Sequence, residues 1–378
     1  MHNFFNRGNQ VMQFTGMQGE LLRCLQTVEK AVATRDTSPA LTGVYMECKD
    51  GELVVRASDM EIGIEAYAGV EVDEPGSAIL EAKFFIPLMR RLPPGEVVIR
   101  ALKEQQMLEI TAGSGSFRLQ TMVADEFPKL DTSERDPLVN LPSHLLARMI
   151  RQTVYATRKE QGHSAFTGLL MEYSSGELKL VATDSSRLCF NRQALPGGQD
   201  FKLIVPARTC AELLRILPTD EESLVEISRM GNQVIFAQDD AIVVSRLLEG
   251  QYPDYNRVIP KSTDVEVIAP CSQLTAALER ANLMGKKGPA VVTFDVEQDM
   301  LRLQSRDVDL GESEELLKVE HHGDGVKSSF QARFVLEMLR TVSSEKVTIG
   351  LSNGLNPGII RPTDSEDYLY VIMPVRTV

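Results

Sequence analysis

The amino-acid sequence repeats itself at intervals of 125 residues. Residues 51–59 read GELVVRASD, and residues 176–184 read GELKLVATD. A weaker third copy, DMLRLQSRD, occupies residues 299–307, and EFPKL at 126–130 matches QYPDY at 251–255. Solenoid repeats reach only about 50 residues, so a period of this length has the size of a whole domain. The chain is therefore predicted to contain one domain three times.

The breaks between copies are predicted where Asp, Ser, Pro and Lys cluster, at residues 131–137 and 260–264. The expected domains are residues 12–133, 138–260 and 265–378. Residues 1–11 are expected to be a disordered extension, and Met12 is an alternative start of the chain.

Within each copy, helical and strand-like patterns alternate. Apolar residues at helical spacing in 19–33 predict a helix, and short alternating runs such as 51–57 and 107–111 predict strands. A second helix is expected near 81–92, followed by more strands. The predicted fold class is α+β, with two helices packed on antiparallel sheets in each of three repeated domains.

Composition restricts the class of protein. The chain has 378 residues, a formal net charge of −13 and no Trp. Its five cysteines include no CxxC pair, so they are expected to be small buried hydrophobic residues in a reducing compartment. The N-terminus does not resemble a signal peptide, and no apolar run is long enough to span a membrane. A cytoplasmic protein without metal or cofactor, and without a membrane partner, is expected.

The positive charges are concentrated in the predicted helices. The six segments 17–35, 81–92, 142–159, 206–217, 270–287 and 331–342 hold 17 of the 40 Lys and Arg residues but only 6 of the 53 acidic residues. In the second helix of each copy, two cations are seven residues apart and so lie on one face. These pairs are Lys83 and Arg90, Arg208 and Arg215, and Arg333 and Arg340.

A basic face on one helix is usually only solvated. The same bias in three repeats instead predicts a positive surface for DNA phosphates inside an acidic shell, and binding without sequence specificity. Two chains related by a two-fold axis would give a six-part ring around duplex DNA. The residues predicted from charge to face the DNA are Lys83, Arg90, Arg151, Arg158, Arg208, Arg215 and Arg340.

Three segments carry a resemblance to a known family: ATDSSRL at 182–188, QYPDYNRVIP at 251–260 and YVIMPVR at 370–376. From Met12 to the C-terminus the chain resembles the bacterial sliding clamp, the beta subunit of the DNA polymerase III holoenzyme. The resemblance implies three clamp-type domains forming a half-ring, and a head-to-tail homodimer that encircles DNA. It also implies processivity without catalysis, binding of the polymerase III catalytic subunit, the clamp loader and other clamp-motif peptides, and a DNA contact at Arg35.

The resemblance further implies a pocket between the second and third domains that binds partner peptides. The family usually has Gly-His where this chain has Ser185-Ser186, which implies a more polar wall. Arg187, Arg257 and Arg376 are expected to hold carboxylates or carbonyls at its rim. The implied pocket residues are Phe166, Thr183, Ser186, Arg187, Leu188, Pro253, Arg257, Val258, Leu355, Pro357, Val371, Ile372, Met373, Pro374, Val375 and Arg376.

For ring closure, the resemblance implies that Phe117 and Leu119 of one chain pack on Leu283 and Met284 of the other. The family's acidic edge is matched by Glu312, Glu314 and Glu315. The opposite edge, residues 111–117, lacks most of the expected basic partners, and only Arg118 is nearby. A ring that opens more easily is therefore expected.

Two other classes of protein remain as alternatives. Asp59, Asp184 and Asp307 end equivalent strands and could suggest a hydrolase, but capping of turns explains repeated Asp residues better. The sequence has no Walker loop, no HExxH motif and no Ser/His/Asp set. A self-assembling β-rich structural protein would explain the triplication but not the repeated cation pairs.

Overall fold

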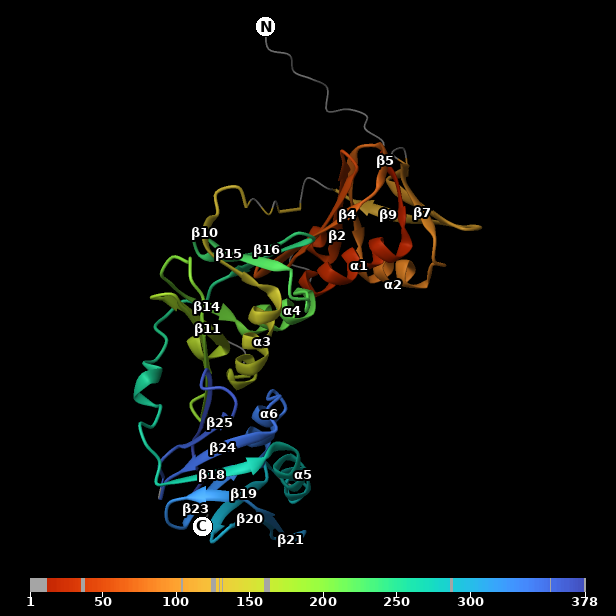
Figure 1. The fold of residues 1–378 in the computed structure, drawn as a ribbon. Helices are drawn as coiled ribbons and strands as arrows, with labels where there is room; N and C mark the ends of the chain where they lie inside the picture. The colour runs from red at the N-terminus through yellow and green to blue at the C-terminus, as the bar shows by residue number, and fades with distance from the viewer. Residues whose placement is uncertain are drawn as a thin grey trace. The chain divides into compact units, whose positions relative to one another are not determined.

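The computed structural model describes residues 12–34, 38–102, 105–123, 127–128, 130, 132–159, 164–285, 288–353 and 355–376. The chain divides into two compact units (Figure 1): unit 1 comprises residues 1–143 and 215–247, and unit 2 comprises residues 144–214 and 248–378. Arg35 and the extension 1–11, both named in the sequence analysis, lie outside the described residues.

Unit 1 is built on one antiparallel sheet, which has 13 strands within the described residues. Its first four strands come from the second repeat, and the other nine come from the first repeat. Their order is β10 (Asp136–Pro142), β15 (Leu224–Met230), β16 (Gln233–Gln238), β17 (Ala241–Arg246), β4 (Ile62–Gly69), β3 (Glu52–Ser58), β2 (Gly43–Lys49), β6 (Gly76–Glu81), β9 (Gly115–Met122), β8 (Met107–Ala112), β7 (Glu96–Leu102), β1 (Gln13–Met17) and β5 (Glu71–Glu74).

Unit 2 contains two antiparallel sheets in the part of the chain that is described. The larger has the order β14 (Phe201–Pro206), β11 (Gly168–Ser174), β12 (Glu177–Thr183), β13 (Arg187–Ala194), β26 (Tyr368–Ile372), β25 (Gly358–Pro362), β24 (Lys346–Leu351), β18 (Val265–Pro270) and β22 (Glu320–His322). The smaller has the order β21 (Gly311–Lys318), β20 (Met300–Asp307), β19 (Val291–Glu297) and β23 (Val326–Gln331).

Each compact unit contains strands of two repeats, because strands of successive repeats pair with each other. In unit 1, β4 of the first repeat pairs with β17 of the second, with Gly63 opposite Val244. In unit 2, β13 of the second repeat pairs with β26 of the third, with Leu188 opposite Val371. Each pairing satisfies backbone N–H and C=O groups that would otherwise form an open sheet edge. The sheets are thus continuous from one repeat to the next.

The six predicted helices are all present in the described residues, and each is shorter than its predicted segment. They are α1 (Gln18–Val28), α2 (Ala82–Arg91), α3 (Ser143–Thr153), α4 (Ala207–Ile216), α5 (Cys271–Asn282) and α6 (Ala332–Leu339). Beyond α1 and α3 the chain tightens into the 3-10 turns Glu29–Ala31 and Val154–Ala156, which accounts for part of the difference. The α+β prediction is confirmed.

The periodicity that predicted α1 is also what holds it in place. Leu21, Cys24, Leu25 and Val28 are buried at spacings of three and four residues, so they form one apolar face. This helix packs against α2 and β4, and in the third repeat α5 packs against α6. The polar side of each helix therefore remains available for charged residues.

The three repeated aspartates cap turns, as predicted. Asp59 Oδ1 accepts hydrogen bonds from the amides of Glu61 and Ile62, both at 3.0 Å. Asp184 and Asp307 do the same for the amides two and three residues ahead, at 2.9 to 3.1 Å. A carboxylate oxygen that accepts hydrogen bonds from two turn amides stabilises the turn. Nothing in these turns supports a hydrolase.

Candidate functional site

An apolar pocket opens in unit 2 where β13 runs beside β26. Its cavity has a volume of about 220 Å³. The third wall comes from the segment after β17, which contains the short 3-10 turn Tyr255–Arg257. The lining residues are Phe166, Thr183, Ser185, Arg187, Leu188, Pro253, Tyr255, Val258, Val371 and Met373.

Strand geometry explains which residues of β26 reach the cavity. Side chains alternate between the two faces of a strand, so Val371 and Met373 share one face and Ile372 lies on the other. The amide of Met373 donates to the carbonyl of Ser186 at 2.9 Å and continues the pairing beyond β26. Val371 is buried, whereas Met373 is 37% exposed at the opening. The cavity therefore has a buried floor at Val371 and an accessible lip at Met373.

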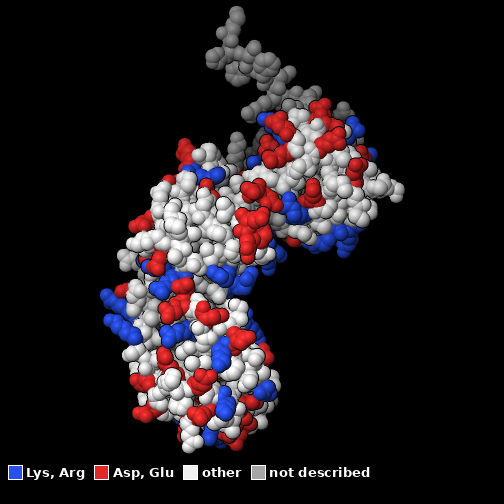
Figure 2. Space-filling model, in the orientation of Figure 1, with Lys and Arg blue, Asp and Glu red and all other residues white. Residues whose placement is uncertain are grey.

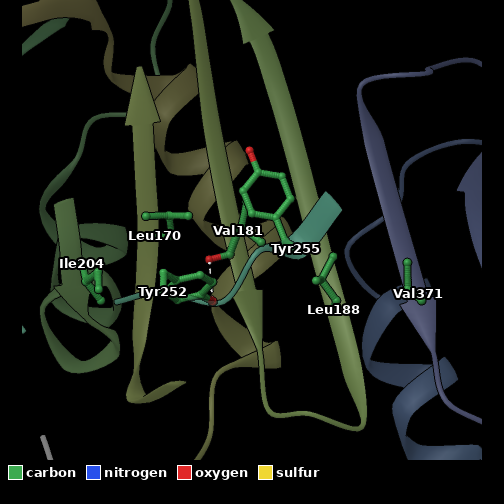
Figure 3. Close-up of a cluster of buried hydrophobic side chains, with 7 residues drawn as sticks. All are labelled: Leu170, Val181, Leu188, Ile204, Tyr252, Tyr255 and Val371. Carbon is green, nitrogen blue, oxygen red and sulfur yellow. Dashed lines mark hydrogen bonds between the residues drawn. The ribbon is translucent and has the colours of Figure 1, made fainter. Parts of the chain in front are cut away.

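A cluster of buried hydrophobic side chains supports the floor. Figure 3 shows Leu188 on β13 next to Val371 on β26, with Tyr252 and Tyr255 beside the strands of the second repeat. The Tyr252 hydroxyl donates to the carbonyl of Val181 at 3.1 Å, drawn as a dashed line in Figure 3. Each buried aromatic or aliphatic side chain contributes about 1.5–3 kcal/mol of transfer free energy. The shape of the pocket is therefore held by the core itself.

Arg187 lies in the wall with its side chain only 1% exposed. It donates to Asp184 Oδ2 at 3.0 Å and to the carbonyl of Tyr155 at 2.8 Å, and it forms an ion pair with Glu337 of α6. Its guanidinium carbon is 4.2 Å from the centre of the Phe334 ring. Three guanidinium donors of Arg187 thus join the second repeat to the third from within the pocket wall, and its role in holding ligands at the rim stays a prediction.

The buried thiol and phenol groups near this junction stay uncharged at neutral pH. Burial raises the pKa of the Cys189 thiol to about 12. Burial also raises the pKa values of Tyr155 and Tyr368 well above the usual value, and their hydroxyl oxygens are 2.8 Å apart. All five cysteines are free, four are buried and Cys271 is partly buried, in agreement with the sequence analysis. Nucleophilic catalysis needs a thiolate, which these surroundings disfavour.

Eight of the residues that the resemblance implied for the pocket line the cavity. They are Phe166, Thr183, Arg187, Leu188, Pro253, Val258, Val371 and Met373. Ile372 is only 1% exposed and faces away, so its assignment is wrong. The other implied residues are not among those that line the cavity: Ser186, Arg257, Leu355, Pro357, Pro374, Val375 and Arg376.

Two lining residues, Ser185 and Tyr255, were not among the implied pocket residues, although Ser185 belongs to the pair implied to make one wall more polar. Ser185 has φ 80°, in the left-handed region, just as Met60 does (φ 74°) at the equivalent turn of the first repeat. The shared spacing after a capping Asp could have identified Ser185. Tyr255 is buried and the Asp254 side chain caps its turn, a local geometry that the sequence signalled only through the QYPDY match.

The residues predicted to face DNA are accessible helix residues. Lys83, Arg90, Arg151, Arg208, Arg215 and Arg340 are exposed, and all lie on α2, α3 and α4 or at the end of α6. Figure 2 shows basic side chains gathered near α2 and around α3 and α4. Some are paired within the chain: Arg90 is 3.3 Å from Glu29, Arg340 is 3.2 Å from Glu279, and Lys83 pairs with Glu81.

Arg158 differs from these residues. It follows the 3-10 turn after α3 and is half-buried. Its guanidinium carbon is 4.9 Å from the centre of the Phe166 ring, and its Nη2 donates to the Ser185 hydroxyl at 3.2 Å. Both partners line the pocket. The structure therefore places Arg158 at the pocket.

The residues implied for ring closure occupy the surfaces of the two units. Phe117 on β9 is 39% exposed and Leu283 after α5 is 71% exposed, whereas Leu119 and Met284 are half-buried. Some of the charged residues nearby form ion pairs within the chain. Arg118 pairs with Glu109 at 2.9 Å, and Glu315 pairs with Arg280 at 2.6 Å. Hydrogen bonding to Arg280 lowers the pKa of Glu315.

Repeated antiparallel α+β domains with basic helix faces and an apolar pocket define a class of binding protein, the sliding clamps. Family models for the N-terminal, central and C-terminal domains of the DNA polymerase III beta subunit match residues 12–131, 140–254 and 256–376. The chain belongs to the DNA polymerase III beta-subunit family. The family prediction from the sequence is confirmed.

Individual relatives agree along the whole chain. The beta sliding clamp of Bacillus subtilis is 30% identical over 97% of this chain and all of its own length. A crystal structure of the Bacillus subtilis clamp has a TM-score of 0.92 at 29% identity, covering 98% of this chain and 100% of that chain. A Pseudomonas aeruginosa clamp bound to griselimycin has a TM-score of 0.92 at 27% identity, covering 97% and 100%.

Membership assigns the chain a role in DNA replication as a sliding clamp, a processivity factor that is not itself an enzyme. Its partners are, in general terms, DNA and polymerase-related proteins. Among the described residues, no helix has the length and apolar character that crossing a membrane requires, and no group of three or more His, Cys, Asp or Glu is placed to hold a metal ion.

The buried position of Arg187 leads to a stability prediction. Arg187→Ala should lower the free energy of unfolding of unit 2 by about 3–4 kcal/mol, because the partly buried carboxylates of Asp184 and Glu337 lose their contact with a buried guanidinium. Urea unfolding followed by tyrosine fluorescence measures this, since six of the eight Tyr residues are in unit 2 and Trp is absent. Arg257→Ala is the control. It removes the 3.0 Å ion pair with Asp254 from an arginine whose side chain is 84% exposed, so it should lower the free energy of unfolding by less than about 1 kcal/mol. Equal effects of the two substitutions would contradict the assignment.

Proposed function

We propose that two copies of this chain form a head-to-tail ring around duplex DNA and that the pocket in unit 2 holds short peptides of partner proteins. The proposed partners are the polymerase III catalytic subunit, the clamp loader and other proteins with a clamp-binding peptide. We also propose the domain boundaries 12–133, 138–260 and 265–378, and a cytoplasmic location. The observation that carries the proposal is the apolar pocket with a buried floor and an exposed lip, in a member of the sliding-clamp family.

Peptide binding is supported by the chemistry of the pocket. Leu188 and Val371 give an apolar floor for a hydrophobic anchor, and Met373 and Val258 are 37% and 41% exposed at the lip. A methionine side chain changes its rotamer at little cost, which suits a site with several partners.

DNA binding is supported by the exposed cations on α2, α3, α4 and α6. The cation pairs on α2 and α4, Lys83 with Arg90 and Arg208 with Arg215, are seven residues apart on exposed helix faces. Lys and Arg contacts to phosphates give affinity without reading the bases. A clamp that must slide needs this kind of contact.

Ring closure is supported by two strand edges. Residues 115–120 of β9 pair with β8 alone among the described strands, and β21 ends its sheet. Unpaired edges can accept a strand from another chain. We propose that β9 of one chain meets β21 of the other, with Phe117 and Leu119 packed on Leu283 and Met284.

The pocket is tested with fluorescein-labelled 20-residue peptides that tile the polymerase III catalytic subunit of the same organism. Val258→Ala with Met373→Ala should weaken the tightest peptide by about tenfold or more, because both lip side chains lose apolar contact. Leu224→Ala is the control and should bind the peptide normally, since Leu224 is 58% exposed on β15 and does not line the cavity. Fluorescence anisotropy measures both. An unchanged affinity in the double variant would remove the pocket from the proposal.

The DNA surface is tested by charge reversal on α4. Arg208→Glu with Arg215→Glu should reduce the amount of clamp loaded on nicked circular plasmid by roughly fivefold or more, because two phosphate contacts become repulsive. Arg229→Glu with Arg246→Glu, on strands β15 and β17, reverses the same charge and should load normally. Gel filtration of loaded DNA gives the yield.

In the same assay, wild-type clamp should remain on the nicked circle and leave once the plasmid is linearised. Retention on the linear plasmid would mean ordinary binding and not encirclement. A normal yield for the α4 double variant would exclude α4 from the DNA surface.

The interface is tested with Leu283→Asp, which places a charge at the proposed contact. It should convert the dimer to monomer at micromolar concentration, because a buried unpaired carboxylate costs several kcal/mol. Leu224→Asp on β15, another exposed leucine (58%), is the control and should remain dimeric. Light scattering after size exclusion distinguishes the two masses, and a dimeric Leu283→Asp would show that the contact lies elsewhere.

A further inference from the structure

The position of Arg158 bears on which peptides the pocket accepts. Two contacts hold its side chain: the Phe166 ring, 4.9 Å from the guanidinium carbon, and the Ser185 hydroxyl, 3.2 Å from Nη2. The backbone contributes as well, since the Arg158 amide donates to the Phe166 carbonyl at 2.8 Å. A half-buried guanidinium is thus held in one orientation beside two residues that line the cavity.

Ser185 reaches Arg158 because its turn is fixed. Its amide donates to the Thr183 hydroxyl at 3.2 Å, and that hydroxyl donates to the Arg187 carbonyl at 2.6 Å. The left-handed backbone at Ser185 (φ 80°) is unusual for a residue with a side chain. The turn is therefore preorganised with the hydroxyl towards the guanidinium.

Arg158 also differs from neighbouring cations in its charge balance. Arg187 pairs with Asp184 and Glu337, Arg257 pairs with Asp254, and the Lys159 amine is 4.0 Å from Glu337. Among the described residues, none places a carboxylate within 4.0 Å of the Arg158 guanidinium. Its π contact and its hydroxyl partner leave a positive charge that no carboxylate of the described residues neutralises.

We propose that Arg158 selects peptides that carry a carboxylate next to the apolar anchor. A guanidinium has five N–H donors, so one bond to Ser185 leaves others for an Asp or Glu side chain. A charge-assisted hydrogen bond in a partly desolvated site is stronger than one in water, and the fixed side chain loses little entropy on binding. This inference rests on the proposed peptide-binding function and names the chemistry of the partner.

A DNA phosphate is the competing ligand, since the sequence analysis placed Arg158 in the DNA-facing set. The structure favours the peptide. Both side chains that hold Arg158 line the pocket, whereas the other described residues predicted to face DNA are exposed on helices or at a helix end.

The test uses full-length clamp and a set of labelled ten-residue peptides with a central Leu-Phe pair. In each peptide one flanking position carries Asp, and in its matched partner the same position carries Asn. With wild-type clamp, at least one position should favour Asp by about fivefold or more. In Arg158→Gln the Asp-to-Asn affinity ratio at that position should fall to about one, and in Arg158→Glu a Lys peptide should bind better than the Asp peptide.

Lys159→Gln is the matched control, because it removes the same charge from the next residue and should keep the ratio. An equal loss of Asp and Asn peptides in Arg158→Gln would assign Arg158 a structural role and overturn the inference. A normal ratio with reduced loading on nicked circular DNA would place Arg158 on the DNA surface and would also overturn it. If no peptide bound wild-type clamp, the proposed function would fail; equal binding of Asp and Asn peptides would remove only the selection by Arg158.

Discussion

The pairing of β13 with β26 is the interaction on which unit 2 depends. It joins the sheets of the second and third repeats through main-chain hydrogen bonds and brings Leu188 opposite Val371. The register matters because a shift by one residue would turn Ile372 towards the cavity and Val371 away from it. The apolar floor, the lip at Met373 and the contact between Met373 and Ser186 all follow from this one alignment.

Arg187 reinforces the same junction by electrostatics. Burying an arginine costs free energy unless its charge is paired with a carboxylate. Here Asp184 of the second repeat and Glu337 of the third form ion pairs with Arg187. Asp184 also caps the turn that holds Ser185 and Arg187. The wall of the pocket and the connection between repeats are consequently the same set of contacts, so binding at the pocket and stability of the junction should not be separable at this residue.

The cations predicted on the helix faces take two different positions in the structure. Lys83, Arg90, Arg208, Arg215 and Arg340 remain exposed, in keeping with a surface for phosphates. Ion pairs with Glu81, Glu29 and Glu279 orient three of these cations. Exposed pairs of this kind contribute little to stability, and they hold the side chains without removing them from the surface. Arg158, which was predicted on the same helix face, lies beyond the end of α3 and contacts Phe166 and Ser185 instead.

The resemblance to the family implied eight of the ten residues that line the pocket. The sequence by itself determined the triplication, the α+β class, the six helices and the turn-capping aspartates. These follow from local rules: spacing along the chain fixes helix faces, and a carboxylate caps the turn beside it. The tertiary structure decided the rest, namely that Ile372 faces the core, that Arg187 is buried, that Ser185 and Tyr255 line the cavity, and that Arg158 lies at the pocket. Each depends on which strand or loop from another repeat packs alongside, and no property of the residue's own neighbours in the chain specifies that.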